Sequence, residues 1–186
     1  PVAQGTRASI VEALGAIRPR LLIVADDEGL KPFETDAFIS HRETPLVAVL
    51  PQDEGQVRDI VRACRKRGVP IVTRGAGTGI SGGAIPLPDG VLLVMTRMRD
   101  IVFIDTQARV AIVEPGVRNA RVSEKAEHLG LFYAPDPSSQ SVCSIGGNVA
   151  ENSGGVHCLK YGLTLHNVLK VRGYTAEGEA VEFGGD

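Results

Sequence analysis

Two segments of the chain carry apolar residues at helical spacing. The run "SIVEALGAI", residues 9–17, predicts a helix, and "DEGQVRDIVRACRKRG", residues 53–68, predicts a second one. The apolar face of the second helix consists of Val57, Ile60, Val61 and Cys64. Asp53 and Gln56 predict a capping box at its start, and Gly68 predicts its end.

Short apolar runs predict strands on both sides of this second helix. The runs lie at residues 20–24, 45–51 and 69–74. The last two enclose the helix and predict a parallel, right-handed β-α-β unit. Later in the chain the apolar runs are shorter and are separated by turns, which favours antiparallel pairing. They comprise strands at 90–95, 100–105 and 109–117, a helix at 117–130, and a hairpin at 167–183.

This change of pattern predicts an α+β fold with two lobes, a small parallel β-α-β lobe followed by an antiparallel α+β lobe. We expect residues 1–44 to form an N-terminal extension, residues 45–105 the first lobe, and residues 106–186 the second. The boundary is placed near Asp105.

Composition limits the classes of function. A chain of 186 residues with 43% hydrophobic content can bury one core or two small ones. A net charge of -2, 4% aromatic residues and no Trp argue against a nucleic-acid partner. The apolar runs are too short for a membrane span, so a cytoplasmic protein is expected, with peripheral membrane association through other subunits left open. The three cysteines form no CxxC pair and are expected to be reduced.

The segment "VTRGAGTGISGGAIP", residues 72–86, contains five glycines between Gly75 and Gly83. A Rossmann loop would be followed at once by a helix, but Pro86 and Pro88 forbid one, and no Lys-Ser or Lys-Thr pair makes a Walker A loop. The backbone amides could still form an anion nest, with the hydroxyls of Thr78 and Ser81 beside them. The alternative is a purely structural loop of several turns.

A second segment, "PDPSSQSVCSIGGNVAENSGG" at residues 135–155, is also rich in glycine and small polar residues. Two such segments together favour one elongated ligand, such as a dinucleotide, with its diphosphate in one nest and a planar ring against glycine backbone. The alternative is that Ser144, Asn148 and Asn152 simply cap helix ends.

Together these two segments resemble the FAD-binding domain of vanillyl-alcohol-oxidase (PCMH) type flavoproteins. The resemblance covers nearly the whole chain and is greatest to the FAD-binding D subunits of glycolate oxidases, among D-lactate and D-2-hydroxyglutarate dehydrogenase relatives. It implies a two-lobed fold clasping FAD and a truncated second lobe without its substrate cap domain. It also implies oxidation of a small 2-hydroxy acid, glycolate to glyoxylate, by hydride transfer to FAD. The implied partners are that substrate and other glycolate oxidase subunits, including an iron-sulfur subunit.

The resemblance assigns the first segment to the FAD pyrophosphate and the second to the flavin and the rest of the cofactor. The residues implied are Arg74, Gly75, Ala76, Gly77, Thr78, Gly79, Ser81 and Gly82, then Pro135, Asp136, Ser139, Cys143, Ser144, Gly146, Gly147, Asn148, Asn152, Ser153, Gly154 and Gly155. Many members carry a histidine where this chain has Thr78, and that histidine bonds covalently to the flavin. Non-covalent FAD is therefore expected.

No catalytic or metal-binding residue is predicted. The adjacent His157 and Cys158 supply too few metal ligands and lack an oriented base. We expect the chain alone to form an oligomer if a sheet edge stays open, and not to turn over glycolate. A different class of function, a non-catalytic nucleotide-binding or assembly module of the same fold, stays open.

Overall fold

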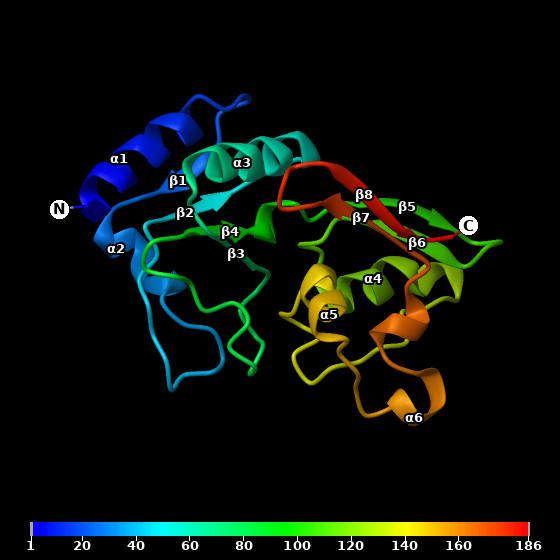
Figure 1. Cartoon of the computed structure of the whole chain (residues 1–186). Coiled ribbons are helices and arrows are strands. Elements are labelled where there is room, and N and C mark those ends of the chain that lie inside the picture. The colour runs from blue at the N-terminus through cyan, green and yellow to red at the C-terminus, as the bar shows by residue number, and fades with distance from the viewer. Residues whose placement is uncertain (1, 186) are drawn as a thin grey trace.

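The structure is a computed structural model that describes residues 2–185, with side chains from residue 7 onward. Its first body is a four-stranded sheet in the order β1-β2-β4-β3 (Figure 1). The strands are β1 (Leu22–Val24), β2 (Val47–Leu50), β3 (Ile71–Arg74) and β4 (Val91–Val94). β1 runs antiparallel to β2, whereas β4 is parallel to both β2 and β3. The expected β-α-β strands are thus parallel, but β4 lies between them.

Two helices, α1 (Val2–Gly15) and α3 (Glu54–Arg67), pack on one face of this sheet. That core contains Ile10, Leu14, Val47, Val49, Ile60, Cys64, Val91 and Leu93, all buried. Alternate strand residues face the other way and pack with Leu30 of the short helix α2 (Asp27–Leu30), which the 3-10 turn η1 (Lys31–Phe33) follows. Residues before position 45, expected as an extension, therefore supply β1 and α1 to the first body.

Helix α3 begins and ends where its sequence predicts. Asp53 accepts a hydrogen bond from the Gln56 amide at 2.8 Å, and Gly68 ends the helix in the left-handed conformation at φ 64°. The Gln56 side chain departs from a capping box, because its oxygen accepts from the Gln52 amide at 2.9 Å and its nitrogen donates to Pro19.

The second body consists of two antiparallel hairpins and short helices (Figure 1). The hairpins are β5 (Ile101–Asp105) with β6 (Val110–Val113), and β7 (Lys170–Tyr174) with β8 (Ala180–Gly184). The helices are α4 (Asn119–Ala126), α5 (Ile145–Glu151) and α6 (Cys158–Tyr161), with 3-10 turns η2 (Met95–Arg97), η3 (Glu127–Leu129) and η4 (Thr164–Asn167). The two hairpins and the helix at 117–130 match the predicted pattern, but no range was predicted for α5. The strand at 90–95, expected among the antiparallel strands, is instead β4, which runs parallel to β2 and β3.

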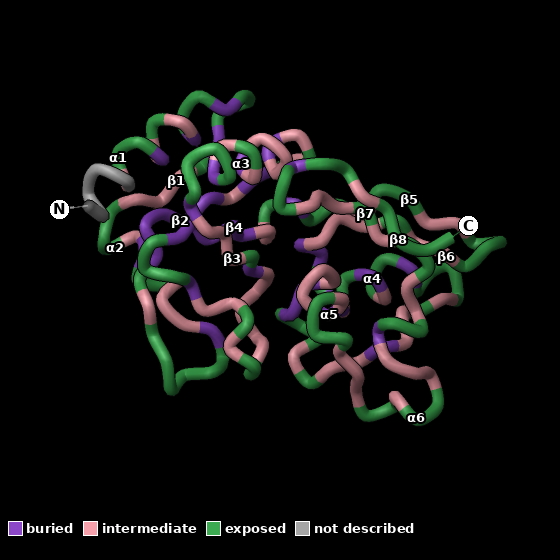
Figure 2. The backbone as a smooth tube through the Cα atoms, in the orientation of Figure 1, coloured by how far each residue is buried: buried purple, intermediate pink, exposed green. Residues whose placement is uncertain are grey.

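Burial differs between the two bodies, with the buried residues concentrated on the strands of the first (Figure 2). β5 and β6 pair across the expected boundary at Asp105, so we propose that the boundary lies before β5, within residues 95–100. None of the helices within residues 2–185 is long and apolar enough to cross a membrane.

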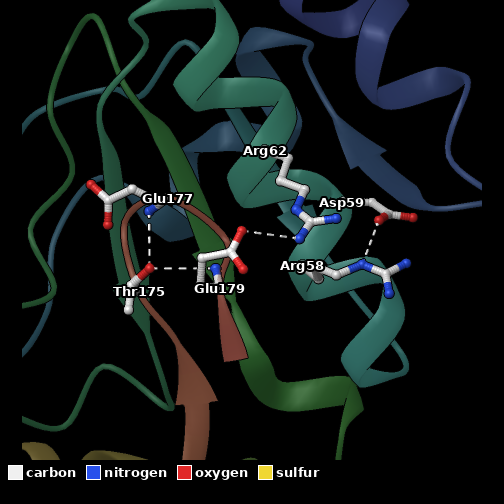
Figure 3. A network of polar contacts seen from close by, with 6 residues as sticks. All are labelled: Arg58, Asp59, Arg62, Thr175, Glu177 and Glu179. Atoms are coloured by element: carbon white, nitrogen blue, oxygen red, sulfur yellow. Dashed lines mark hydrogen bonds and ion pairs between the residues drawn. The ribbon is translucent and has the colours of Figure 1, made fainter. Parts of the chain in front are cut away.

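Charged side chains join α3 to the β7–β8 hairpin across the two bodies. The Arg62 guanidinium of α3 lies 3.4 Å from the Glu179 carboxylate, and Figure 3 shows this contact beside Thr175. Arg172 also pairs with Glu54 at 2.9 Å. Both pairs are exposed to solvent, so each contributes little to stability.

Candidate functional site

The glycine loop leaves β3 and lies over a buried polar layer. Gly77 and Gly82 have φ angles of +71° and +80°, which glycine adopts without strain. Beneath Gly77 lies the guanidinium of Arg74, only 8% exposed, which donates to the Thr35 carbonyl at 2.7 Å. Burial lowers the pKa of Arg74, and nearby Asp36 opposes that effect. Arg74 therefore supports the loop from below, and its contact with the cofactor stays a prediction.

Asp36 fastens the far end of the same loop. Its carboxylate is buried and accepts from the backbone amides of Phe38 at 2.8 Å and Ala84 at 3.3 Å. Beyond that point lies a hollow of about 490 Å³. It is lined by Phe38, His41, Glu43, Gly82, Ile85, Pro86, Leu87 and Pro88. None of these residues belongs to residues 135–155.

The second segment is shaped by a capped helix. Ser144 caps α5 by accepting from the Gly147 amide at 3.3 Å, and Asn152 ends it with φ 48°. The Asn152 side chain also accepts from the Leu165 amide at 2.9 Å. Ser144 and Asn152 thus are helix caps, as the alternative interpretation expected. Asn148 is not a cap, because it lies inside the helix.

Close backbone contacts surround this helix. A Cβ on Gly146 would lie 2.8 Å from the Pro115 ring, and a Cβ on Gly155 would overlap the Asp136 backbone. The start of the segment is held by the buried amide of Asn119, which donates to the Pro135 carbonyl at 3.0 Å. Glycine is therefore required here for packing of chain against chain as well as for any approach of a ligand.

The two glycine segments meet. A Cβ on Gly75 would overlap the Ser144 hydroxyl and lie 3.8 Å from the Gly147 Cα atom. Farther along, the Ser81 hydroxyl lies 2.7 and 2.9 Å from the two carboxylate oxygens of Glu151, which is 70 residues away in the sequence. The convergence that a single elongated ligand would require is therefore present.

An unpaired donor lies in the same region. The Asn148 side chain is 2% exposed, and its Nδ2 atom has no hydrogen-bond partner among the described residues. Such a buried orphan costs folding free energy unless a ligand satisfies it. A dinucleotide is rich in acceptor oxygens and nitrogens, so its chemistry fits a site that holds an unpaired donor of this kind.

Asp136 and His157 form a hydrogen-bonded pair at the edge of the segment. His157 Nδ1 lies 2.6 Å from the Asp136 carboxylate, and the His157 backbone amide donates to the other oxygen at 3.3 Å. The side-chain hydrogen bond from His157 holds the pKa of Asp136 below its ordinary value. Within residues 2–185, no group of three or more His, Cys, Asp or Glu side chains could hold a metal ion.

Four residues that the sequence did not single out shape the site: Asp36, Pro115, Asn119 and Glu151. Three of them lie outside both glycine segments, and only tertiary contacts bring them there. Glu151 lies within the second segment, but nothing in the sequence indicates that its carboxylate contacts Ser81 of the first.

A family model described as an FAD binding domain matches residues 45–184. The chain belongs to this family. FAD is accordingly the cofactor of this domain, and the two glycine segments both fall within the matched residues.

This FAD-binding domain is 53% identical over 180 residues to the glycolate oxidase subunit GlcD of Escherichia coli K12. It is 37% identical over 153 residues to the GlcD subunit of Bacillus subtilis. The alignments cover 97% and 82% of this chain but only 36% and 33% of those proteins. The chain thus spans about a third of the length of these relatives.

Solved structures share the fold. The domain superposes on alkyldihydroxyacetonephosphate synthase with a TM-score of 0.83 at 21% identity, covering 95% of this chain and 38% of that one. It superposes on p-cresol methylhydroxylase with a TM-score of 0.82 at 22% identity, covering 96% and 35%. The two-lobed PCMH-type α+β fold expected from the sequence is confirmed.

Proposed function

We propose that this chain is the FAD-binding part of a flavin-dependent 2-hydroxy acid dehydrogenase, of the glycolate oxidase type, which oxidises glycolate to glyoxylate. The observation that carries the proposal is the meeting of the two glycine segments beside the orphan Asn148 donor. The similarity to two glycolate oxidase subunits supports the substrate class.

We assign the diphosphate to the amides of the first loop, from Gly75 to Gly79, with the Thr78 hydroxyl beside them. The flavin and the rest of the cofactor are assigned to the second segment, in which the Asn148 amide supplies a ready donor. The glycine backbone permits the close approach that a planar ring needs. The other residues that the resemblance implied keep the same assignment as proposals.

FAD when bound supplies an acceptor for the hydride that leaves the carbon of a 2-hydroxy acid as its hydroxyl proton goes to a base. The residues of this chain bind and orient that cofactor. We propose that the base and the groups that hold the substrate carboxylate come from the rest of the full-length protein, since this chain spans 36% of the Escherichia coli relative.

The same similarity supports a proposal on partners. Because both relatives are named as subunits, we propose that the full-length protein works with other subunits, including an iron-sulfur subunit that accepts electrons. We also propose that the protein is cytoplasmic and is peripheral to the inner membrane through those subunits.

The experiment is anaerobic reduction of the full-length protein loaded with FAD. Glycolate is expected to bleach the oxidised-flavin absorbance in a saturable way, with D-lactate as the comparison substrate. If FAD binds but no 2-hydroxy acid reduces it, the non-catalytic binding module is the correct function.

Acid precipitation of the same sample tests whether FAD is bound covalently. Because Thr78 stands in the loop, we expect the yellow colour in the supernatant and a colourless pellet.

A further inference from the structure

Glu151, the last residue of α5, lies against the glycine loop of the other lobe. Its two carboxylate oxygens are 2.7 and 2.9 Å from the Ser81 hydroxyl. A Cβ atom added to Gly83 would lie 3.3 Å from the same carboxylate, and one added to Gly79 would lie 3.6 Å from it. The side chain thus spans the loop from residue 79 to residue 83, and Figure 1 shows α5 and the loop after β3 on facing sides of the two bodies.

A carboxylate at this place needs a physical reason. It adds a negative charge beside backbone that we assign to an anionic diphosphate, and like charges repel. It also takes the only proton that the Ser81 hydroxyl can donate. The Ser81 hydroxyl therefore donates to Glu151, and only its acceptor lone pairs remain for the cofactor to which the sequence analysis assigned it. A charge-assisted hydrogen bond between the lobes is a gain that can offset this repulsion.

We propose that Glu151 is a positioning residue that fastens the glycine loop to α5 through Ser81 and so holds the two halves of the FAD site at binding distance. This inference rests on the proposed function, because it places the cofactor between these two segments. The other links between the bodies, such as Arg62 with Glu179 at 3.4 Å, join α3 to the β7–β8 hairpin (Figure 3). These ion pairs touch neither glycine segment, and the remaining contact between the segments, Gly75 with Ser144, is one of packing.

The first test needs no cofactor. The amides of Ala84 and Ile85 are hydrogen-bonded to Asp36 and to the Gly82 carbonyl, so their hydrogen exchange reports opening of the loop. Glu151→Ala and Ser81→Ala are each expected to speed this exchange about fivefold. Glu179→Ala, the matched control, removes an exposed glutamate that also links the lobes and should leave the exchange unchanged. Unchanged exchange in Glu151→Ala would overturn the proposal.

The second test is a double-mutant cycle on the dissociation constant of FAD. Glu151→Ala and Ser81→Ala should each raise it about fivefold, and the double variant should raise it no further, because both remove the same contact. Ser81→Thr, which keeps the hydroxyl, should retain the affinity of the original chain. A merely structural loss would not be rescued by the hydroxyl in this way. Additive effects, or tighter FAD binding by Glu151→Ala, would contradict the positioning role.

The two tests separate the inference from the function on which it rests. If the original chain binds no FAD while Glu151→Ala opens the loop, the contact stands and the proposed function fails. If FAD binds with equal affinity to Glu151→Ala and to the original chain, the function stands and the positioning role is wrong.

Discussion

At the scale of single residues, the glycines of the site serve different needs that the sequence does not distinguish. Gly77 requires a left-handed φ of +71° and lies on a buried guanidinium, whereas Gly79 has only an ordinary contact at 3.6 Å. The motif predicted that both residues belong to one loop. It could not predict Arg74 beneath Gly77, because that contact depends on how the strand ends.

Gly77→Ala is expected to lower the free energy of unfolding of the cofactor-free chain by about 1–2 kcal/mol, from the left-handed conformation alone. Displacement of the Arg74 guanidinium should add to that loss. Gly79→Ala, the matched control two residues away, should leave the stability unchanged or slightly raised. Urea denaturation of both variants checks the prediction, and equal losses would show that the Gly77 conformation is not the cause.

At the scale of elements, α3 could be predicted and α5 could not. The cap, the apolar face and the terminal glycine of α3 all agree, so local signals and tertiary packing point the same way. Helix α5 contains Gly146 and Gly147, two poor helix formers, and it forms because Ser144 and Asn152 cap it and the chain around Pro115 packs on it. Its sequence indicated flexible backbone, whereas the structure uses that backbone for close packing.

Cys64 makes α3 sensitive to alkaline pH. The thiol is fully buried, and desolvation raises its pKa from the ordinary 9.0 to about 12. In the unfolded chain the thiol ionises near pH 9, so above that pH the unfolded state binds fewer protons than the folded state. Stability should therefore fall by about 1.4 kcal/mol per pH unit between pH 9 and about 12.

Unfolding of the original chain and of Cys64→Ala, followed across this pH range, measures the effect. Other groups titrate in both proteins, so the informative quantity is the difference in their stability. Cys64→Ala is expected to be the less stable protein at pH 8 and to lose that disadvantage as the pH rises. A difference that stays constant with pH would show that the thiol does not ionise differently in the two states.

At the scale of the whole molecule, the change of hydrophobic pattern predicted two lobes, and the fold confirms them. Pattern alone did not place β4 between β2 and β3, because strand order depends on contacts far apart in the sequence. Nor did it include α1 and β1 in the first body, since the long polar connection before residue 45 suggested a separate extension. The candidate site lies where the two bodies meet, and contacts such as Ser81 with Glu151 join residues far apart in the sequence, so local patterns cannot predict them.

The central claim is that FAD binds where the two glycine segments meet. The most direct measurement is an FAD titration of the cofactor-free chain and of Asn148→Ala, followed by the change in flavin absorbance. We predict saturable binding of one FAD per chain, weakened about tenfold in Asn148→Ala because the buried amide loses its bond to the cofactor. Binding of equal strength by both proteins, or no binding by either, would contradict the claim.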